Sequence, residues 1–166
     1  MICPACGFDN IAGNDECDRC GTPLAGADLP APQTRFEARL VDGRLSGLAS
    51  HSPRTVEPGT LVADVIATMR ADGLDGVLVV EDGRLIGIFT ERDALLKLAG
   101  RTLAGISVND VMTADPVVLR EEDTVAVAIH KMALGGFRHI PLVDGGRPTG
   151  IVTARDVFHR IAEIVG

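Results

Sequence analysis

The sequence predicts an α+β protein in which one structural unit occurs twice, behind a small cysteine-containing segment. Two observations lead to this fold class. The pattern of residues 87–93, Gly-Ile-Phe-Thr-Glu-Arg-Asp, returns 63 residues later at 150–156 as Gly-Ile-Val-Thr-Ala-Arg-Asp. Two Cys-x-x-Cys motifs lie within the first 20 residues. With 166 residues, of which 46% are apolar, the chain has material for one moderate core and a small appendage.

The N-terminal segment, residues 1–24, carries all four cysteines as two pairs separated by ten residues: Cys3 and Cys6, then Cys17 and Cys20. Four thiolates at this spacing can close a tetrahedral site, which in structural sites most often holds Zn²⁺. A glycine follows each pair and permits the tight turn that directs backbone N–H groups at sulfur. The segment resembles a minimal zinc ribbon. A disulfide pair and a rubredoxin-like iron site are the alternatives that the same cysteines leave open.

The predicted ribbon is acidic and too short to bury a core of its own, so we expect the metal to supply most of its folding free energy. Its acidic residues Asp9, Asp15, Glu16 and Asp18 stand against the cation Arg19, and the whole chain has a formal net charge of −7. Nucleic-acid binding needs clustered Lys and Arg to release counterions, so this charge argues against it. A structural or protein-facing role fits the ribbon better.

Two segments connect the ribbon to the repeated units. In residues 25–35, prolines interleave with Gly and Ala without an apolar period, which predicts a linker. In the lead-in segment 36–52, Phe36, Ala38 and Leu40 alternate with polar residues and predict a short strand.

Each repeated unit is predicted to contain an amphipathic helix, a strand, a turn, a strand and a second helix. The apolar positions that predict the inner face of the first helix are Leu61, Val62, Val65, Ile66 and Met69 in one unit and Val125, Ala128, Ile129 and Met132 in the other. The second helices begin at Glu91 and Ala154, with predicted inward side chains Ala94, Leu95, Leu98, Val157, Phe158 and Ile161.

The junction between the last strand and the second helix of each unit is where we expect chemistry. Thr90 and Asp93 in the first unit, and Thr153 and Asp156 in the second, have the spacing of a capping box. The same junction presents free backbone N–H groups and the positive end of the helix dipole, which can bind phosphate beside a carboxylate that accepts from ribose hydroxyls. The short motif alone favours the cap, whereas its duplication within a whole repeated unit favours a function.

Three motifs carry a family resemblance: Gly87-Ile88-Phe89-Thr90-x-x-Asp93, Arg138-His139-Ile140-Pro141-Leu142-Val143-Asp144 and Gly150-Ile151-Val152-Thr153-x-x-Asp156. Through them, roughly two thirds of the chain resembles a tandem pair of CBS domains, the arrangement called a Bateman module. The resemblance implies two βαββα-type units over residues 53–105 and 106–166. It also implies a homodimer and an adenosine-containing ligand in the cleft between the repeats.

By this resemblance the ligand-binding residues are Thr90 and Asp93 in one half-site and Arg138, His139, Ile140, Pro141, Thr153 and Asp156 in the other. In the second half-site, Asp156 would hold the ribose, Thr153 and Arg138 would face phosphate, and the backbone of residues 140–141 would lie beside adenine. AMP, ADP, ATP and S-adenosylmethionine share the adenosine that this motif can hold.

The two half-sites are expected to be unequal. At the 63-residue offset, Arg138 and His139 correspond to Asp75 and Gly76, so a cationic pair in one unit replaces an anion and a glycine in the other. Because phosphate needs donors and positive charge, we expect the second half-site to bind more tightly. The alternatives are that Arg138 pairs with a surface carboxylate and that His139 is a strand-edge residue.

No set of catalytic residues emerges, since the sequence has neither a nucleophile elbow nor a paired-histidine metal motif. We therefore expect no enzyme but a regulatory module that senses a nucleotide, with the ribbon as a protein-interaction appendage. The alternative is an interaction and dimerisation scaffold that binds no ligand. The sequence shows no apolar run long enough to span a membrane and no signal-peptide pattern, so the expected location is the cytoplasm.

Overall fold

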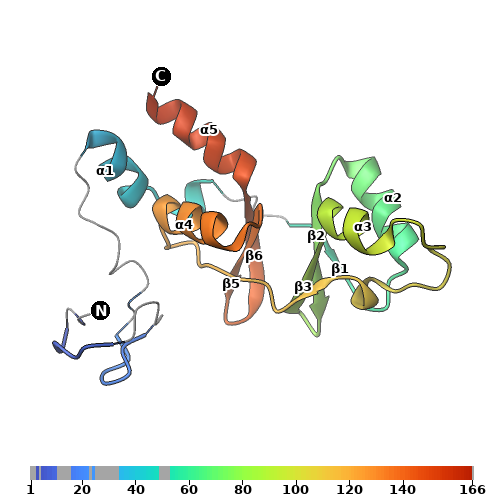
Figure 1. Ribbon diagram of the computed structural model, residues 1–166, viewed down its shortest axis with the longest axis horizontal. Helices are drawn as coiled ribbons and strands as arrows, with labels where there is room; N and C mark the ends of the chain where they lie inside the picture. The colour runs from blue at the N-terminus through green and yellow to red at the C-terminus, as the bar shows by residue number, and fades with distance from the viewer. Residues whose placement is uncertain are drawn as a thin grey trace.

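The computed structural model describes residues 3, 5–10, 16–22, 24, 34–48 and 53–165. Two similar units lie side by side in it, one with the helices labelled α2 and α3 and one with α4 and α5 (Figure 1). The predicted linker 25–35 falls almost entirely outside the described residues. None of the helices in the described part of the chain is long and apolar enough to cross a membrane.

The first unit is a four-stranded sheet with two helices. Its strands lie in the order β1 (Thr55–Val56), β2 (Gly76–Glu81), β3 (Arg84–Thr90) and β4 (Thr113–Ala114), with β1 parallel to β2 and the other neighbours antiparallel. The helix α2 (Val62–Asp72) packs on β2, and α3 (Glu91–Leu98) packs on β3. Phe89 is fully buried in the core that they enclose.

The second unit repeats this plan with a two-stranded sheet. The antiparallel strands are β5 (His139–Asp144) and β6 (Arg147–Thr153), and the helices are α4 (Val125–Gly135) and α5 (Ala154–Val165). The two hairpins have the same register, because Gly76 pairs with Thr90 and His139 pairs with Thr153 at equivalent positions. The predicted order of helix, hairpin and helix is therefore confirmed in both units.

The core of each unit is completed by the segment that precedes the other unit in the sequence. The 3₁₀ turn η1 (Leu45–Gly47) lies before the first unit, yet Leu45 is fully buried in the core of the second. The 3₁₀ turn η2 (Val108–Asp110) lies before the second unit, yet Val108 is fully buried in the core of the first. Neither unit is complete without the chain that crosses to it.

The strand predicted from Phe36, Ala38 and Leu40 is wrong, because these residues lie in the helix α1 (Arg35–Asp42). Thr34 caps this helix, and Thr34 and Glu37 form the reciprocal pair of a capping box. A short alternation of apolar and polar residues is compatible with either structure, and the cap decides it. The helix packs on α4 and α5 of the second unit.

Three predicted inward side chains are also wrong, the first being Leu61, which precedes α2 as its N-cap residue and is 45% exposed. Leu95 on α3 is 73% exposed, and Phe158 on α5 is 66% exposed. These residues occupy equivalent positions in the two units, 63 residues apart. The neighbouring positions Leu98 and Val157 are buried as predicted.

Candidate functional site

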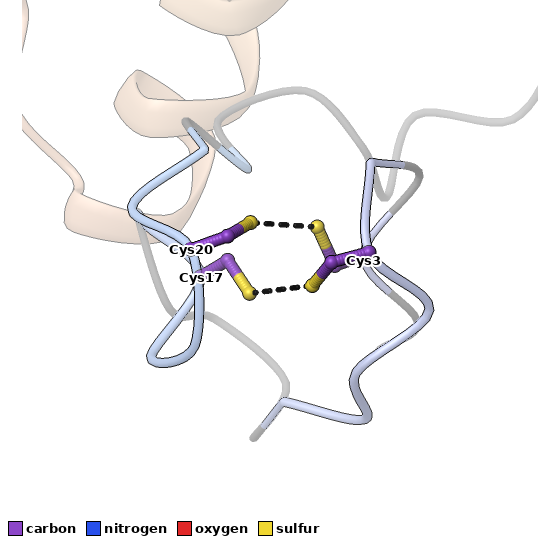
Figure 2. Close-up of side chains that lie close together, drawn as sticks. Cys3, Cys17 and Cys20 are labelled. Atoms are coloured by element: carbon purple, nitrogen blue, oxygen red, sulfur yellow. Dashed lines mark hydrogen bonds between the residues drawn. The ribbon is translucent and has the colours of Figure 1, made fainter.

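The four cysteines of the N-terminal segment bring their sulfur atoms together, with every pair within 4.8 Å (Figure 2). The Cys3 and Cys20 sulfurs are 3.7 Å apart, and those of Cys6 and Cys17 are 3.6 Å apart. Sulfurs bound to one tetrahedral Zn²⁺ at about 2.3 Å lie about 3.8 Å from each other, so this donor set fits such an ion. The four thiols are free, which argues against the disulfide alternative. A tetrahedral iron would require the same geometry.

Two similar turns position the sulfurs. The N–H groups of Gly7 and Gly21 donate to the carbonyls of Cys3 and Cys17, at 2.9 and 2.8 Å. Both glycines have positive φ, 70° and 67°, as the sequence predicts for residues that close such turns.

Asn10 joins the two turns, and sequence reasoning missed it. The Asn10 side chain donates to the carbonyl of Phe8 at 3.0 Å and accepts from the N–H of Asp18 at 2.9 Å. Only 5% of Asn10 is exposed. A polar residue shortly after the first cysteine pair was the one available signal.

Cys17 is predisposed to the thiolate form that metals bind. Burial opposes its ionisation, but hydrogen bonds from the backbone of Arg19 and Cys20 outweigh this effect. The pKa of Cys17 is lowered to about 6.

Both strand–helix junctions form the predicted capping boxes. The Thr90 N–H and hydroxyl donate to Asp93 Oδ2 at 2.9 and 2.7 Å. The Thr153 N–H and hydroxyl donate to Asp156 Oδ2 at 2.8 and 2.7 Å. Each cap therefore uses one carboxylate oxygen, Oδ2, and the chemical difference between the junctions depends on the other.

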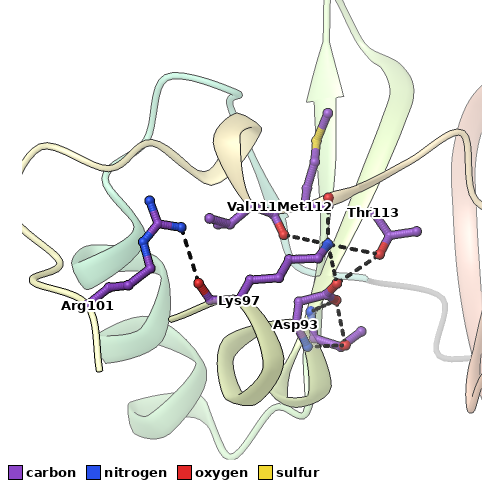
Figure 3. Close-up of polar contacts among 7 residues, drawn as sticks. Asp93, Lys97, Arg101, Val111, Met112 and Thr113 are labelled. Carbon is purple, nitrogen blue, oxygen red and sulfur yellow. Dashed lines mark hydrogen bonds and ion pairs between the residues drawn. The ribbon is translucent and has the colours of Figure 1, made fainter. Parts of the chain in front are cut away.

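At the first junction Asp93 is enclosed by further donors (Figure 3). Its Oδ1 accepts from the Thr113 hydroxyl and forms an ion pair with Lys97 Nζ, both at 2.8 Å. Burial alone would raise the pKa of Asp93, but hydrogen bonds from Lys97, Thr90 and Thr113 outweigh it and hold the pKa below its ordinary value. Lys97 Nζ also donates to the carbonyls of Val111 and Met112, both at 2.9 Å.

At the second junction a cavity of about 200 Å³ opens between the two units. The second unit contributes Ile151, Thr153, Arg155 and Asp156, and the first contributes Pro53, Arg54, Leu74, Asp75, Gly76 and Leu78. Two arginines and two aspartates lie in this lining, so the cavity has charges of both signs. The apolar side chains provide flanks for a flat ring.

The remaining residues predicted for the second half-site, 138–141, are not among the residues that line this cavity. Arg138 is exposed, and its carbonyl accepts from the N–H of Ala154 at 2.8 Å. His139 Nε2 lies 3.1 Å from Asp75 Oδ1, and so it joins the two units. Ile140 and Pro141 are buried in β5.

Several lining residues were missed by sequence reasoning, among them Arg54, Asp75 and Gly76. The prediction assumed that each half-site is built from one repeat, whereas the cavity combines the junction of one repeat with the start of β2 in the other. The signal was present, because Asp75 and Gly76 are the repeat equivalents of Arg138 and His139.

Comparisons with known proteins agree with the repeated architecture. A family model described as CBS domain matches residues 45–100 and 108–163. Inosine-5′-monophosphate dehydrogenase from Korarchaeum cryptofilum is 36% identical over 107 residues, which are 64% of this chain but only 22% of that enzyme.

Solved structures show the same fold. The hexameric CBS-CP12 protein from bloom-forming cyanobacteria has a TM-score of 0.64 and 25% identity over 70% of each chain. The CBS domain pair of protein MJ0100, in complex with 5′-methylthioadenosine and S-adenosyl-L-methionine, has a TM-score of 0.65 and 23% identity. That match covers 74% of this chain and 99% of the other.

Proposed function

The chain belongs to the CBS domain family, and we propose that it is a regulatory module that binds an adenosine-containing ligand between its two repeats. The observation that carries this proposal is the cavity lined by both units, with Thr153 and Asp156 on one side. A ligand there contacts both units at once and favours the arrangement that binds it better. Its regulatory effect is limited by its difference in affinity for the two arrangements.

The cavity offers a partner for each part of such a ligand. Asp156 uses Oδ2 for the cap, which leaves Oδ1 to accept from ribose hydroxyls. Leu74 and Ile151, which are both partly exposed, can flank the adenine ring, and Arg54 and Arg155 supply positive charge for an anionic group. AMP, ADP, ATP and S-adenosylmethionine all remain within this class. The two ligands of protein MJ0100 contain the same adenosine group.

Arg138 and His139 take supporting roles in this proposal. The Arg138 carbonyl holds the N–H of Ala154, the first residue of α5. His139 lies against Asp75, which lines the cavity. Both residues thus help to position the walls of the proposed site from outside.

The ribbon is proposed to be a structural zinc site that serves as a protein-interaction appendage. Cys3, Cys6, Cys17 and Cys20 would hold the ion, and the acidic side chains around them would repel nucleic acid. A reducing compartment keeps such thiols available for metal, so the cytoplasm is the proposed location.

A homodimer is the proposed assembly. Leu95 and Phe158 project from equivalent positions of α3 and α5 and are mostly exposed. Burying these two side chains against a second copy of the chain would remove apolar surface of both repeat units from water. The cyanobacterial CBS-CP12 protein, which is hexameric, is a relative that does assemble.

The second candidate function is a scaffold that dimerises and binds a protein partner without a ligand. It is favoured by the same exposed helix side chains and by the cavity volume of about 200 Å³, which is below the roughly 300 Å³ at which small-molecule sites usually begin. In the ligand-binding proposal, part of the ligand extends out of the cavity into solvent.

Thermal unfolding of the full chain with AMP, ADP, ATP and S-adenosylmethionine distinguishes the two functions. A ligand at about 100 times its Kd adds about 2.7 kcal/mol to the free energy of unfolding. We expect one of the four to do so, and we expect Asp156→Asn to weaken its binding at least tenfold. His159→Gln, at an exposed position of the same helix, is the matched control and should bind normally. If none of the four raises the unfolding temperature, the scaffold is the better description.

A further inference from the structure

The two strand–helix junctions have the same capping hydrogen bonds, but the surroundings of their aspartates differ. Asp93 is enclosed by donors of the protein, whereas Asp156 lines a cavity. Asp93 and Asp156 each accept two hydrogen bonds at Oδ2, from the N–H and the hydroxyl of the threonine three residues earlier. The corresponding donor–acceptor distances at the two junctions agree within 0.1 Å. Any ligand that needs a carboxylate must therefore use Oδ1. The environment of Oδ1 decides whether a junction is available.

At the first junction Oδ1 of Asp93 is already occupied by the chain itself (Figure 3). It accepts from the Thr113 hydroxyl and pairs with Lys97 Nζ at 2.8 Å each, and these two donors use the lone pairs that Oδ1 offers. Only 9% of the Asp93 side chain is exposed. A ribose hydroxyl would have to displace an ammonium group that is also held by the carbonyls of Val111 and Met112.

At the second junction, the residue equivalent to Lys97 does not form an ion pair with the aspartate. Lys97 corresponds to Arg160, which pairs with Glu163 at 3.1 Å instead of turning back to Asp156. In the described part of the chain, the Asp156 side chain accepts its hydrogen bonds from the N–H and the hydroxyl of Thr153.

The arginine between threonine and aspartate also differs between the junctions. Arg92 Nη1 donates to the carbonyl of Gly136 in the opposite unit at 2.8 Å. Its equivalent, Arg155, lines the cavity together with Asp156. At the first junction both the cation and the carboxylate are thus used within the protein, while at the second both face the cavity.

We propose that Lys97 is a built-in occupant of the first half-site, so that each chain binds one ligand, at Asp156. This inference rests on the proposed ligand-binding function and adds its stoichiometry. Lys97 holds Asp93 together with residues 111–113, the segment that leads from the first unit to the second. The first junction is therefore a fixed connection, and the second is the one free to respond to ligand.

Isothermal titration calorimetry with AMP, ADP, ATP and S-adenosylmethionine tests this on the full chain and on matched variants. The unmodified chain should bind one ligand per chain, and Asp156→Asn should remove that event. Lys97→Met keeps the aliphatic stem but removes the ammonium group, and it should add a second, weaker event at Asp93. Arg160→Met, at the equivalent position, should leave the single event unchanged within about threefold.

The outcomes separate this inference from the function on which it rests. Two events in the unmodified chain, or one that survives Asp156→Asn, would overturn the single-site inference while leaving ligand binding intact. A folded Lys97→Met chain with no second event would overturn the role of Lys97, and circular dichroism checks that this variant is folded. Absence of any binding by the unmodified chain would overturn the proposed function and this inference with it.

Discussion

The cysteine segment and the repeat pair are stabilised in different ways. Among the described residues of the segment, the buried apolar cluster consists of Cys3, Cys17 and Leu24, so two of its three members are predicted metal ligands. The first repeat unit instead buries a cluster of nine apolar side chains, Phe89 among them, that come from helices, strands and the crossing segment. Loss of the metal should therefore unfold the cysteine segment and leave the repeat pair folded, whereas mutations in the repeat cores should destabilise the repeat pair and leave the metal site intact.

Metal removal has the largest expected effect. Cys17→Ser, or chelation under reducing conditions, should release one zinc per chain and unfold the ribbon, because binding of structural zinc contributes about 10–16 kcal/mol in small zinc domains. The repeats should keep their cooperative unfolding transition. Elemental analysis and thermal unfolding measure the two parts. Iron in place of zinc would refute the metal assignment, and loss of the repeat transition in Cys17→Ser would refute independent folding.

A core mutation at the crossing segment has the next largest effect. Leu45→Ala should destabilise the protein by about 2–5 kcal/mol, since Leu45 is fully buried and its removal leaves a cavity. Although Leu45 precedes the first unit, the affected core is that of the second. Hydrogen exchange should therefore accelerate more in β5 and α4 than in β2 and α2. The reverse order would show that the crossing segment packs otherwise, and Leu134→Ala, at a position of α4 that is 76% exposed, is the control.

The sequence predicted what depends on neighbouring residues and missed what depends on distant ones. The capping boxes at Thr90 and Thr153 and the repeated hairpins follow from local spacing, so they were recognised. The burial of Leu45 in the second unit joins residues far apart in the chain, and no local pattern signals it. Lys97 lies on a predicted helix four residues after Asp93, so their ion pair is local. The hydrogen bonds of both residues to Thr113 are not local, because Thr113 comes close only when β4 pairs with β3.

For the same reason, the sequence predicts only the part of the candidate site that is built from neighbouring residues. Thr153 and Asp156 were identified from their motif, and both line the cavity. Arg54 and Asp75 lie in the opposite unit, and assigning them required knowing that the two repeats face each other across the cavity. Helical periodicity has a similar limit, because it identifies an apolar face of a helix but not whether that face is buried in the same unit. Leu95 and Phe158 were predicted to be buried and are exposed.

The smallest expected effect is a pH dependence confined to the repeats. Asp93 has a folded-state pKa below its ordinary value of 3.8, despite the opposing effect of burial, because Lys97, Thr90 and Thr113 donate to it. Its contribution to stability is therefore present at neutral pH and is lost as the pH falls below about 4 through the folded-state pKa. We expect Asp93→Asn to cost about 1 kcal/mol at pH 7, because Lys97 is partly exposed and solvent screens the pair. This difference should shrink towards pH 3 in urea unfolding, measured in a Cys17→Ser background so that acid release of metal does not contribute. A difference that stays constant between pH 6 and pH 3 would show that Asp93 acts by packing rather than by its charge.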